Sequence, residues 1–117
     1  GYVGIYTNDF SSSGNASTID HSYIPETFIL EQNHPNPFNP VTTLRYNLPE
    51  DAMVNITIYD MKGREVSTLV SNHQNAGFKS VQWNATNNKG APVSAGLYMY
   101  TIEVGQFRQT KKMVLLK

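Results

Sequence analysis

Apolar and polar residues alternate with a period of two along most of the chain after residue 40. Leu44, Tyr46 and Leu48 share one face of an extended segment, whereas the residues between them point to the other face. Similar segments lie at residues 43–48, 54–59, 66–70, 78–84, 97–104 and 107–116. None keeps the 3.6-residue period of an amphipathic helix. The pattern predicts an all-β protein, an Ig-like antiparallel β-sandwich of seven or eight strands with almost no helix.

Turn residues separate these segments. Residues 60–64 suit a short hairpin loop in which Gly63 supplies a left-handed conformation, and residues 105–106 suit a tight turn. Residues 71–77 are polar and end in glycine, so we expect a loop there. Residues 97–104 are apolar on both faces at their start, which is typical of a central strand.

The inward-facing residues of these strands are expected to form a single core. The predicted core consists of Leu44, Tyr46, Ile56, Ile58, Val66, Leu69, Val81, Trp83, Tyr98, Tyr100, Ile102, Val114 and Leu115.

Residues 34–40 contain three prolines around one large apolar residue, Phe38. Proline fixes φ and lacks a backbone donor, so neither a helix nor a central strand can run through this stretch. We interpret it as the boundary between an extended arm or linker (residues 1–29) and a sandwich domain (residues 30–117). Residues 23–30 regain apolar character and predict a first edge strand.

Composition and charge narrow the function classes. The chain has no cysteine, which excludes disulfides and thiolate metal sites, and no apolar run approaches the roughly 18 residues of a membrane-spanning helix. The net charge is zero, but every Lys and Arg lies at or after Arg45, whereas Asp9, Asp20, Glu26 and Glu31 precede it. The later part lacks a dense basic stripe, so nucleic acid is not an expected partner.

Two groups of residues have the composition of binding sites, but their positions favour structural roles. Trp83, Tyr98 and Tyr100 could form a sugar-binding platform, yet inward strand positions favour the core. A second group resembles a calcium loop but offers amide oxygens where a hard cation prefers carboxylates. This group consists of Asn84, Asn87, Asn88 and Gly90.

Nothing in the sequence indicates catalysis. His21, His34 and His73 have no metal-ligand spacing, and we expect them at the surface. Asp20, His21 and Ser22 are the residue types of a catalytic triad, but neighbours in an extended chain point to opposite sides. We therefore predict no enzyme activity, no metal and no cofactor.

Several motifs, at specific spacings, resemble one family. The quoted residues are Pro35-Asn36-Pro37-Phe38-Asn39-Pro40, residues 42–46 and 54–60, Gly63-Arg64-Glu65-Val66, Trp83, Gly90, residues 92–98 and Lys111-Lys112-Met113-Val114-Leu115. Together they resemble the type A C-terminal sorting domains of type IX secretion, found in Bacteroidetes and related phyla. The fold of that family resembles the Ig-like domain of the flagellar hook-capping protein. The resemblance covers residue 30 to the last residue.

The resemblance implies an address rather than an activity. An outer-membrane secretion machinery reads such domains after export to the periplasm, and the cargo reaches the cell surface or the medium. The matching recognition candidates are Pro37, Phe38, Asn39, Gly63, Gly96, Lys111, Lys112, Val114 and Leu115. An alternative interpretation of Arg108, Lys111, Lys112 and Lys117 is that they keep an edge strand from aggregating.

The N-terminal arm supports a different hypothesis, in which the chain is a subunit of an extracellular filament. Residues 2–6 have the length and composition of a strand that could pair with the sheet edge of another copy. The arm's acidic residues would be attracted to the basic domain. The arm residues expected to make the contact are Tyr2, Val3, Ile5 and Tyr6.

Overall fold

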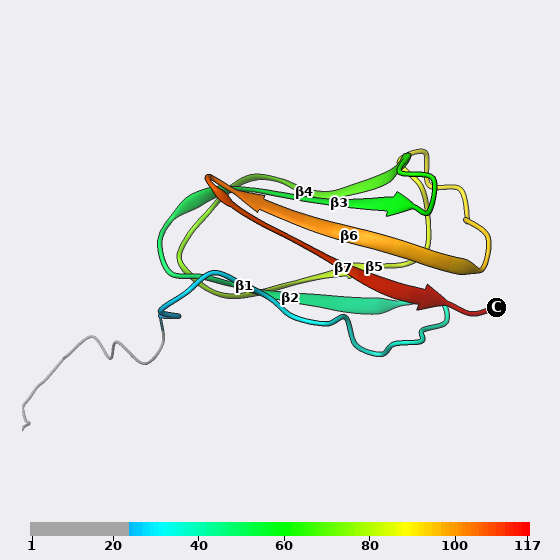
Figure 1. Ribbon diagram of the computed structural model, residues 1–117, viewed down its shortest axis with the longest axis horizontal. Helices are drawn as coiled ribbons and strands as arrows, with labels where there is room; N and C mark the ends of the chain where they lie inside the picture. The colour runs from blue at the N-terminus through cyan, green and yellow to red at the C-terminus, as the bar shows by residue number, and fades with distance from the viewer. Residues whose placement is uncertain (1–23) are drawn as a thin grey trace, which may run out of the picture.

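The computed structural model describes residues 24–117, which form two antiparallel sheets and, within that range, no helix. The strands are β1 (Ile29–Leu30), β2 (Thr42–Leu48), β3 (Ala52–Asp60), β4 (Glu65–Gln74), β5 (Gly77–Trp83), β6 (Gly96–Val104) and β7 (Phe107–Leu115). One sheet has the order β1-β2-β5 and the other β4-β3-β6-β7. They face each other as an Ig-like sandwich of seven strands, as predicted (Figure 1).

Strand register explains how alternation in the sequence fills the space between the sheets. Leu44 of β2 lies opposite Val81 of β5, and Ile56 of β3 lies opposite Ile102 of β6. Paired residues share a face of the sheet, so each apolar row points into the sandwich. Strand β6 lies between β3 and β7, which confirms the prediction of a central strand.

The core agrees with most of the predicted residues. Nine are buried: Leu44, Tyr46, Ile56, Ile58, Trp83, Tyr98, Tyr100, Ile102 and Leu115. Val66, Leu69 and Val81 are partly buried against this cluster. The prediction was wrong for Val114, which is only half-buried because Met113 and Leu115 occupy the inward positions of β7.

Two boundaries also differ from the prediction. The expected loop at residues 71–77 is mostly strand, because β4 continues to Gln74 and its last residues pair with β3 from Ala52 to Asn55. Its residues are polar because this part of β4 is at a solvent-exposed sheet edge. The first strand has only two residues, Ile29 and Leu30, and pairs with β2 at the edge of its sheet.

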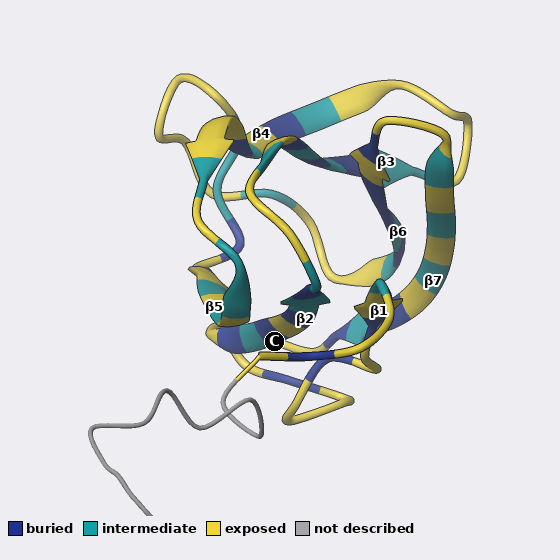
Figure 2. Cartoon of the chain, turned by 90° about the vertical axis from the view of Figure 1, so that its left-hand side faces the viewer, coloured by how far each residue is buried: buried dark blue, intermediate teal, exposed yellow. Residues whose placement is uncertain are grey.

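The edge strands of the two sheets lie on two opposite sides of the sandwich (Figure 2). Strands β1 and β7 are the edges on one side, and β4 and β5 are the edges on the other. The residues that join β1 to β2, residues 31–41, are called the lead-in below. They run beside β7, on the first of these two sides (Figure 1). Within residues 24–117, no helix is long and apolar enough to cross a membrane.

Candidate functional site: the lead-in against the last strand

The proline-rich part of the lead-in is hydrogen-bonded to the end of β7. Phe38 N donates to the Val114 carbonyl at 3.0 Å, and Leu116 N donates to the Phe38 carbonyl at 2.9 Å. These bonds form a parallel bridge between Phe38 and Leu115. The side-chain oxygen of Asn36 accepts a further bond from Val114 N at 3.0 Å. We call these contacts the latch, because they join segments nearly 80 residues apart in the sequence.

Further hydrogen bonds join this region of the chain to β7, farther from the C-terminal end of that strand. Gln32 Nε2 donates to the Lys112 carbonyl at 2.8 Å, and just before the lead-in Leu30 N of β1 donates to the side-chain oxygen of Gln109 at 3.3 Å. An edge strand normally presents unpaired backbone groups to solvent. Here the lead-in occupies that edge from Lys112 to the end of β7, so this part of the edge is closed to pairing.

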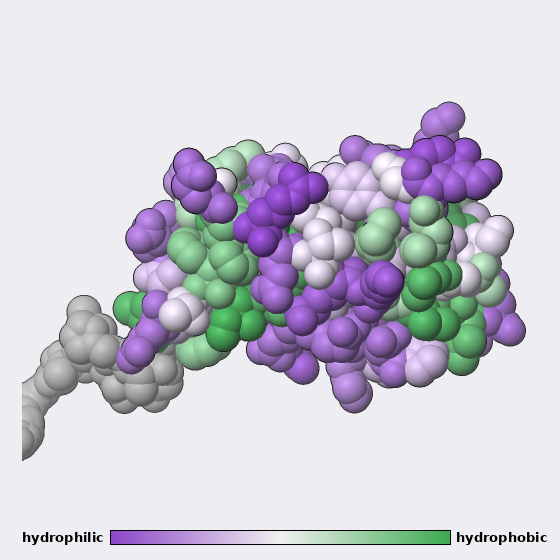
Figure 3. Space-filling view, in the orientation of Figure 1, coloured by the Kyte–Doolittle hydropathy of each residue, from purple (hydrophilic) through white to green (hydrophobic). Residues whose placement is uncertain are grey.

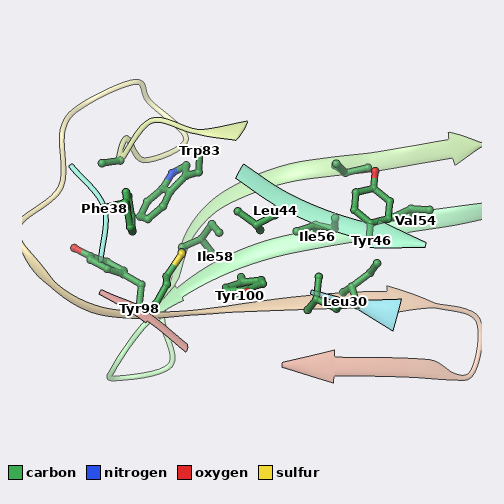
Figure 4. Packing of buried hydrophobic residues seen from close by; sticks show 14 of the residues in the cluster. Leu30, Phe38, Leu44, Tyr46, Val54, Ile56, Ile58, Trp83, Tyr98 and Tyr100 are labelled. Carbon is green, nitrogen blue, oxygen red and sulfur yellow. The ribbon is translucent and has the colours of Figure 1, made fainter. Parts of the chain in front are cut away.

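Phe38 fastens the latch to the core. Its side chain is 1% exposed and packs against Trp83, with ring centroids 5.8 Å apart. Trp83 in turn meets Tyr98 edge-to-face at 5.3 Å, and its Nε1 donates to the Thr86 carbonyl at 2.8 Å. Figure 4 shows Phe38, Trp83 and Tyr98 grouped at one end of the core. Aromatic pairs in such arrangements are stabilising beyond their buried area.

The buried polar groups of the lead-in are also hydrogen-bonded. Asn33 N donates to Tyr100 Oη at 2.7 Å, and that hydroxyl donates to the Glu31 carbonyl at 2.8 Å. Asn33 Nδ2 donates to Thr42 Oγ1 at 3.0 Å, while Thr42 Oγ1 donates to the Pro35 carbonyl at 2.9 Å. Asn33 and Thr42 are both buried, so each bond replaces one that water would otherwise make. This network joins the lead-in to Tyr100 of β6 and to Thr42 of β2.

Tyr100→Phe should test this network. It would leave the buried Asn33 N–H without a partner and should lower the free energy of unfolding by about 1–3 kcal/mol. Burial raises the pKa of Tyr100 to about 12. Its phenol therefore stays protonated in the folded chain at pH values where the unfolded chain ionises, near pH 10. Its contribution to stability is present below about pH 10 and is lost as pH rises through about 12.

Denaturant unfolding at pH 8, 10 and 11, followed by circular dichroism, measures both effects. Burial also raises the pKa of Tyr46 and Tyr98, so the unsubstituted protein should lose stability in alkali. The Tyr100→Phe variant should lose less between pH 10 and 11. Parallel pH profiles for the two proteins would contradict the role assigned to Tyr100.

Gly63 and Gly96 lie at the same end of the sandwich as the latch, here called the latch end. Gly63 has φ of 82° in the loop between β3 and β4, which confirms the expected left-handed residue. In that loop Asp60 Oδ1 accepts hydrogen bonds from Arg64 N and Lys62 N, at 3.0 and 2.9 Å. The bond from Arg64 N is the main cause that lowers the pKa of the Asp60 carboxyl. Gly96, at φ 149°, begins β6 opposite Leu115.

The predicted recognition residues thus fall into two kinds. Phe38 and Leu115 are buried, so they shape the latch from inside, and Val114 and Lys111 are half-buried. Those exposed to solvent are Pro37, Asn39, Gly63, Gly96 and Lys112. Lys111 and Lys112 lie further along β7, opposite Tyr100 and Met99. In Figure 3 hydrophobic residues gather at both ends of this face, with a hydrophilic band between them.

The chain enters the sandwich at the end opposite the latch (Figure 1). Phe28 stacks on Phe107 there, with ring centroids 5.4 Å apart. The predicted arm contacts, Tyr2, Val3, Ile5 and Tyr6, lie outside the described residues.

The residues of the two alternative binding sites have structural roles. Trp83, Tyr98 and Tyr100 are 1%, 7% and 0% exposed, so they offer no aromatic face for a sugar. In the Asn-rich loop, Asn87 Oδ1 accepts bonds from Lys89 N and Ala91 N. Within residues 24–117, no three metal-binding side chains of His, Cys, Asp or Glu gather. The Asn87 amide thus stabilises the loop, and the Asn88 amide joins the loop to Thr68 and Glu65 of β4.

The residues that sequence reasoning missed are polar amides. Asn33, Asn36 and Gln32 make bonds that hold the lead-in, and Gln109 accepts a bond from Leu30 of β1. Their only signal in the sequence is that Asn36 lies between two prolines and Asn33 comes just before the proline-rich stretch 34–40. An amide in a polar stretch gives no indication of a partner 79 or 80 residues away.

Ig-like sandwiches form a broad class, and comparison with known families places the chain within it. Residues 40–106 match the family model of the FlgD Ig-like domain, which is more than half of the chain. The chain belongs to this family. The matched residues end before β7 and leave out nearly all of the lead-in, so the latch joins two segments that flank the match.

Solved structures show similar domains. The crystal structure of dimeric latent PorU from Porphyromonas gingivalis is 25% identical with a TM-score of 0.60, over 76% of this chain and 9% of that one. PorZ, described as an essential surface component of the type IX secretion system of the same bacterium, is 20% identical with a TM-score of 0.52, over 74% and 11%. FlgD from P. aeruginosa is 19% identical with a TM-score of 0.52, over 79% and 73%. Curated proteins gave no match.

Proposed function

We propose that this chain is a non-catalytic sorting and anchoring module, read by the outer-membrane machinery of type IX secretion on the way from the periplasm to the cell surface or the medium. One observation carries the proposal. Two parts of the sorting-domain resemblance, the proline-rich lead-in and the end of β7, are hydrogen-bonded to each other at the latch. The fold shared with domains of PorU and PorZ supports it, since the resemblance implies an Ig-like fold.

The geometry suits a module that follows a cargo. A domain preceding residue 24 would attach at the end opposite the latch (Figure 1). Pro37, Asn39 and Lys112 would then stay exposed to a receptor whatever the cargo is. A rigid folded module that presents its signal away from its point of attachment can serve many cargoes.

The proposal assigns the domain no reaction. The described groups with displaced pKa values, Tyr46, Asp60, Tyr98 and Tyr100, are all engaged in structural bonds. Tyr46 Oη donates to Gln74 and Tyr98 Oη donates to the Ser94 carbonyl, both at 2.6 Å. Perturbed groups at a catalytic site would be expected in a cleft and free to react.

A reporter fused in front of residues 30–117 tests the proposal in a host that has type IX secretion. The reporter should reach the surface or the medium. Lys112→Glu should reduce export severalfold, because it reverses an exposed charge on β7 without touching the core. Arg45→Glu, the same change at an exposed position of β2, is the matched control and should be exported normally. A folded fusion that stays in the periplasm would limit the resemblance to the fold.

A filament subunit remains the second candidate function, and one observation favours it. Strand β5 is a seven-residue sheet edge and, among residues 24–117, it pairs only with β2. It is long enough to accept residues 2–6 of another copy by strand addition. Electron microscopy of the purified chain tests this, since fibres that vanish when residues 2–6 are deleted would support it, and their absence would exclude it.

A further inference from the structure

The side of the sandwich formed by β4 and β5 differs from the side closed by the latch. The start of β4 is capped by the 86–92 loop, where Asn88 N donates to the Val66 carbonyl and Asn88 Oδ1 accepts from Thr68 N. No hydrogen bond among residues 24–117 reaches the outer side of β5. Within the part of the chain that the structure describes, the outer side of β5 is therefore open to pairing with another strand.

Lys79 lies on this uncovered edge and points inward. In the β2–β5 register Lys79 is opposite Tyr46, which is buried, so both side chains face the space between the sheets. Lys79 is half-buried, and its Cε is 3.8 Å from the position that a Cβ on Gly77 would occupy. Neither ion pair among residues 24–117 involves it. A charged side chain at an inward position of an edge strand opposes pairing, because pairing would remove the charge from water.

We infer that β5 is the surface through which a second copy of this chain would pair, and that Lys79 prevents that pairing. Two β5 strands joined antiparallel about a two-fold axis at Ser80 would place Lys79 of each copy opposite Val81 of the other. The two Lys79 residues would then occupy diagonal positions of the strand pair, about 7–8 Å apart between Cα atoms. Both ammonium groups would lie in the same enclosed row. Apart from Lys79, that row is apolar or glycine: Gly77, Val81 and Trp83.

The inference goes beyond the sorting role and does not depend on it. It also bears on the filament, because a donated strand would have to tolerate or neutralise Lys79. The outward residues of β5 include Phe78, which is 62% exposed and would add apolar contact once pairing began. The lysine is therefore the feature of β5 that opposes association.

The experiment compares full-length variants by sedimentation over a concentration series and by hydrogen exchange of the β5 amides. Lys79→Met keeps an unbranched side chain, shorter by the ammonium group, and removes the charge. It should associate at a concentration at least ten-fold below that of the unsubstituted chain, with newly protected β5 amides. Lys79→Gln should change in the same direction and serves as a second uncharged variant.

Two controls separate the charge on the open edge from other effects. Lys79→Arg keeps the charge and should behave as the unsubstituted chain does. Lys111→Met removes a lysine from the inward row of β7, where it lies opposite buried Tyr100, but the lead-in covers that edge. It should leave association unchanged. The inference is overturned if the folded uncharged Lys79 variants do not associate more than the unsubstituted chain, if Lys79→Arg associates equally, or if the β5 amides gain no protection.

Discussion

Replacing Trp83 with alanine is expected to lower the free energy of unfolding by about 3–5 kcal/mol. Trp83 is 1% exposed and is the largest side chain in the core. Its loss would open a cavity between Phe38 and Tyr98, which it contacts at centroid distances of 5.8 and 5.3 Å. Its bond to the Thr86 carbonyl would also go. Because it is the only tryptophan, denaturant unfolding must be followed by circular dichroism rather than by tryptophan fluorescence.

The same substitution should loosen the latch before it unfolds the domain. Phe38 would lose its aromatic partner, and the backbone bonds from Phe38 N and Leu116 N lie next to it. Hydrogen exchange at those two amides should therefore accelerate more than exchange in β3 or β6. Trp83→Phe retains a ring and should cost less. A loss below about 1 kcal/mol for Trp83→Ala would contradict the packing described here.

The alternation of apolar and polar residues predicted the strands well wherever one face of a strand is buried and the other faces solvent. β2 and β3 have that environment, with Leu44, Leu48, Ile56 and Ile58 at 0% exposure. A one-residue shift would turn these side chains to solvent, so hydrophobicity alone defines the phase. The sequence also predicted the turn at Gly63 correctly, because a left-handed backbone conformation at that position favours glycine.

The prediction of strands from hydrophobicity failed where a strand is formed by backbone pairing without burial of one face. Residues 71–74 are polar, yet they complete the β3–β4 ladder at an exposed edge. The apolar character of Val114 predicts a core position, but Met113 and Leu115 on either side of it are the buried residues of β7. Hydrophobicity gives no phase where apolar residues are consecutive.

The candidate site was predictable in its parts but not in its assembly. The prolines showed that the lead-in could not be a central strand, and the resemblance named both segments. The sequence did not show that Asn36 would accept a bond from Val114 N, or that Tyr100 would support Asn33 from a distance of 67 residues. Such contacts depend on the whole fold, because the lead-in lies beside β7 only when the two sheets face each other.

Deleting residues 113–117 is expected to abolish folding. The deletion removes Met113 and Leu115, which are 0% and 1% exposed, and loss of a large buried side chain typically costs about 2–5 kcal/mol. Together these losses approach the whole stability of a typical domain, about 5–15 kcal/mol. The acceptor of Phe38 N and the donor to the Phe38 carbonyl go as well. Circular dichroism and amide hydrogen exchange should show an unfolded chain.

Deleting only residues 116 and 117 is the matched control. It keeps Leu115 in the core and removes one latch bond, from Leu116 N to the Phe38 carbonyl, so the domain should remain folded. The comparison decides how export of truncated reporters is interpreted. Failure after the longer deletion would reflect unfolding, whereas failure after the shorter one would point to recognition at the latch. A folded protein of near-normal stability without residues 113–117 would show that the end of β7 is dispensable for the sandwich, and that truncations alone can map the signal.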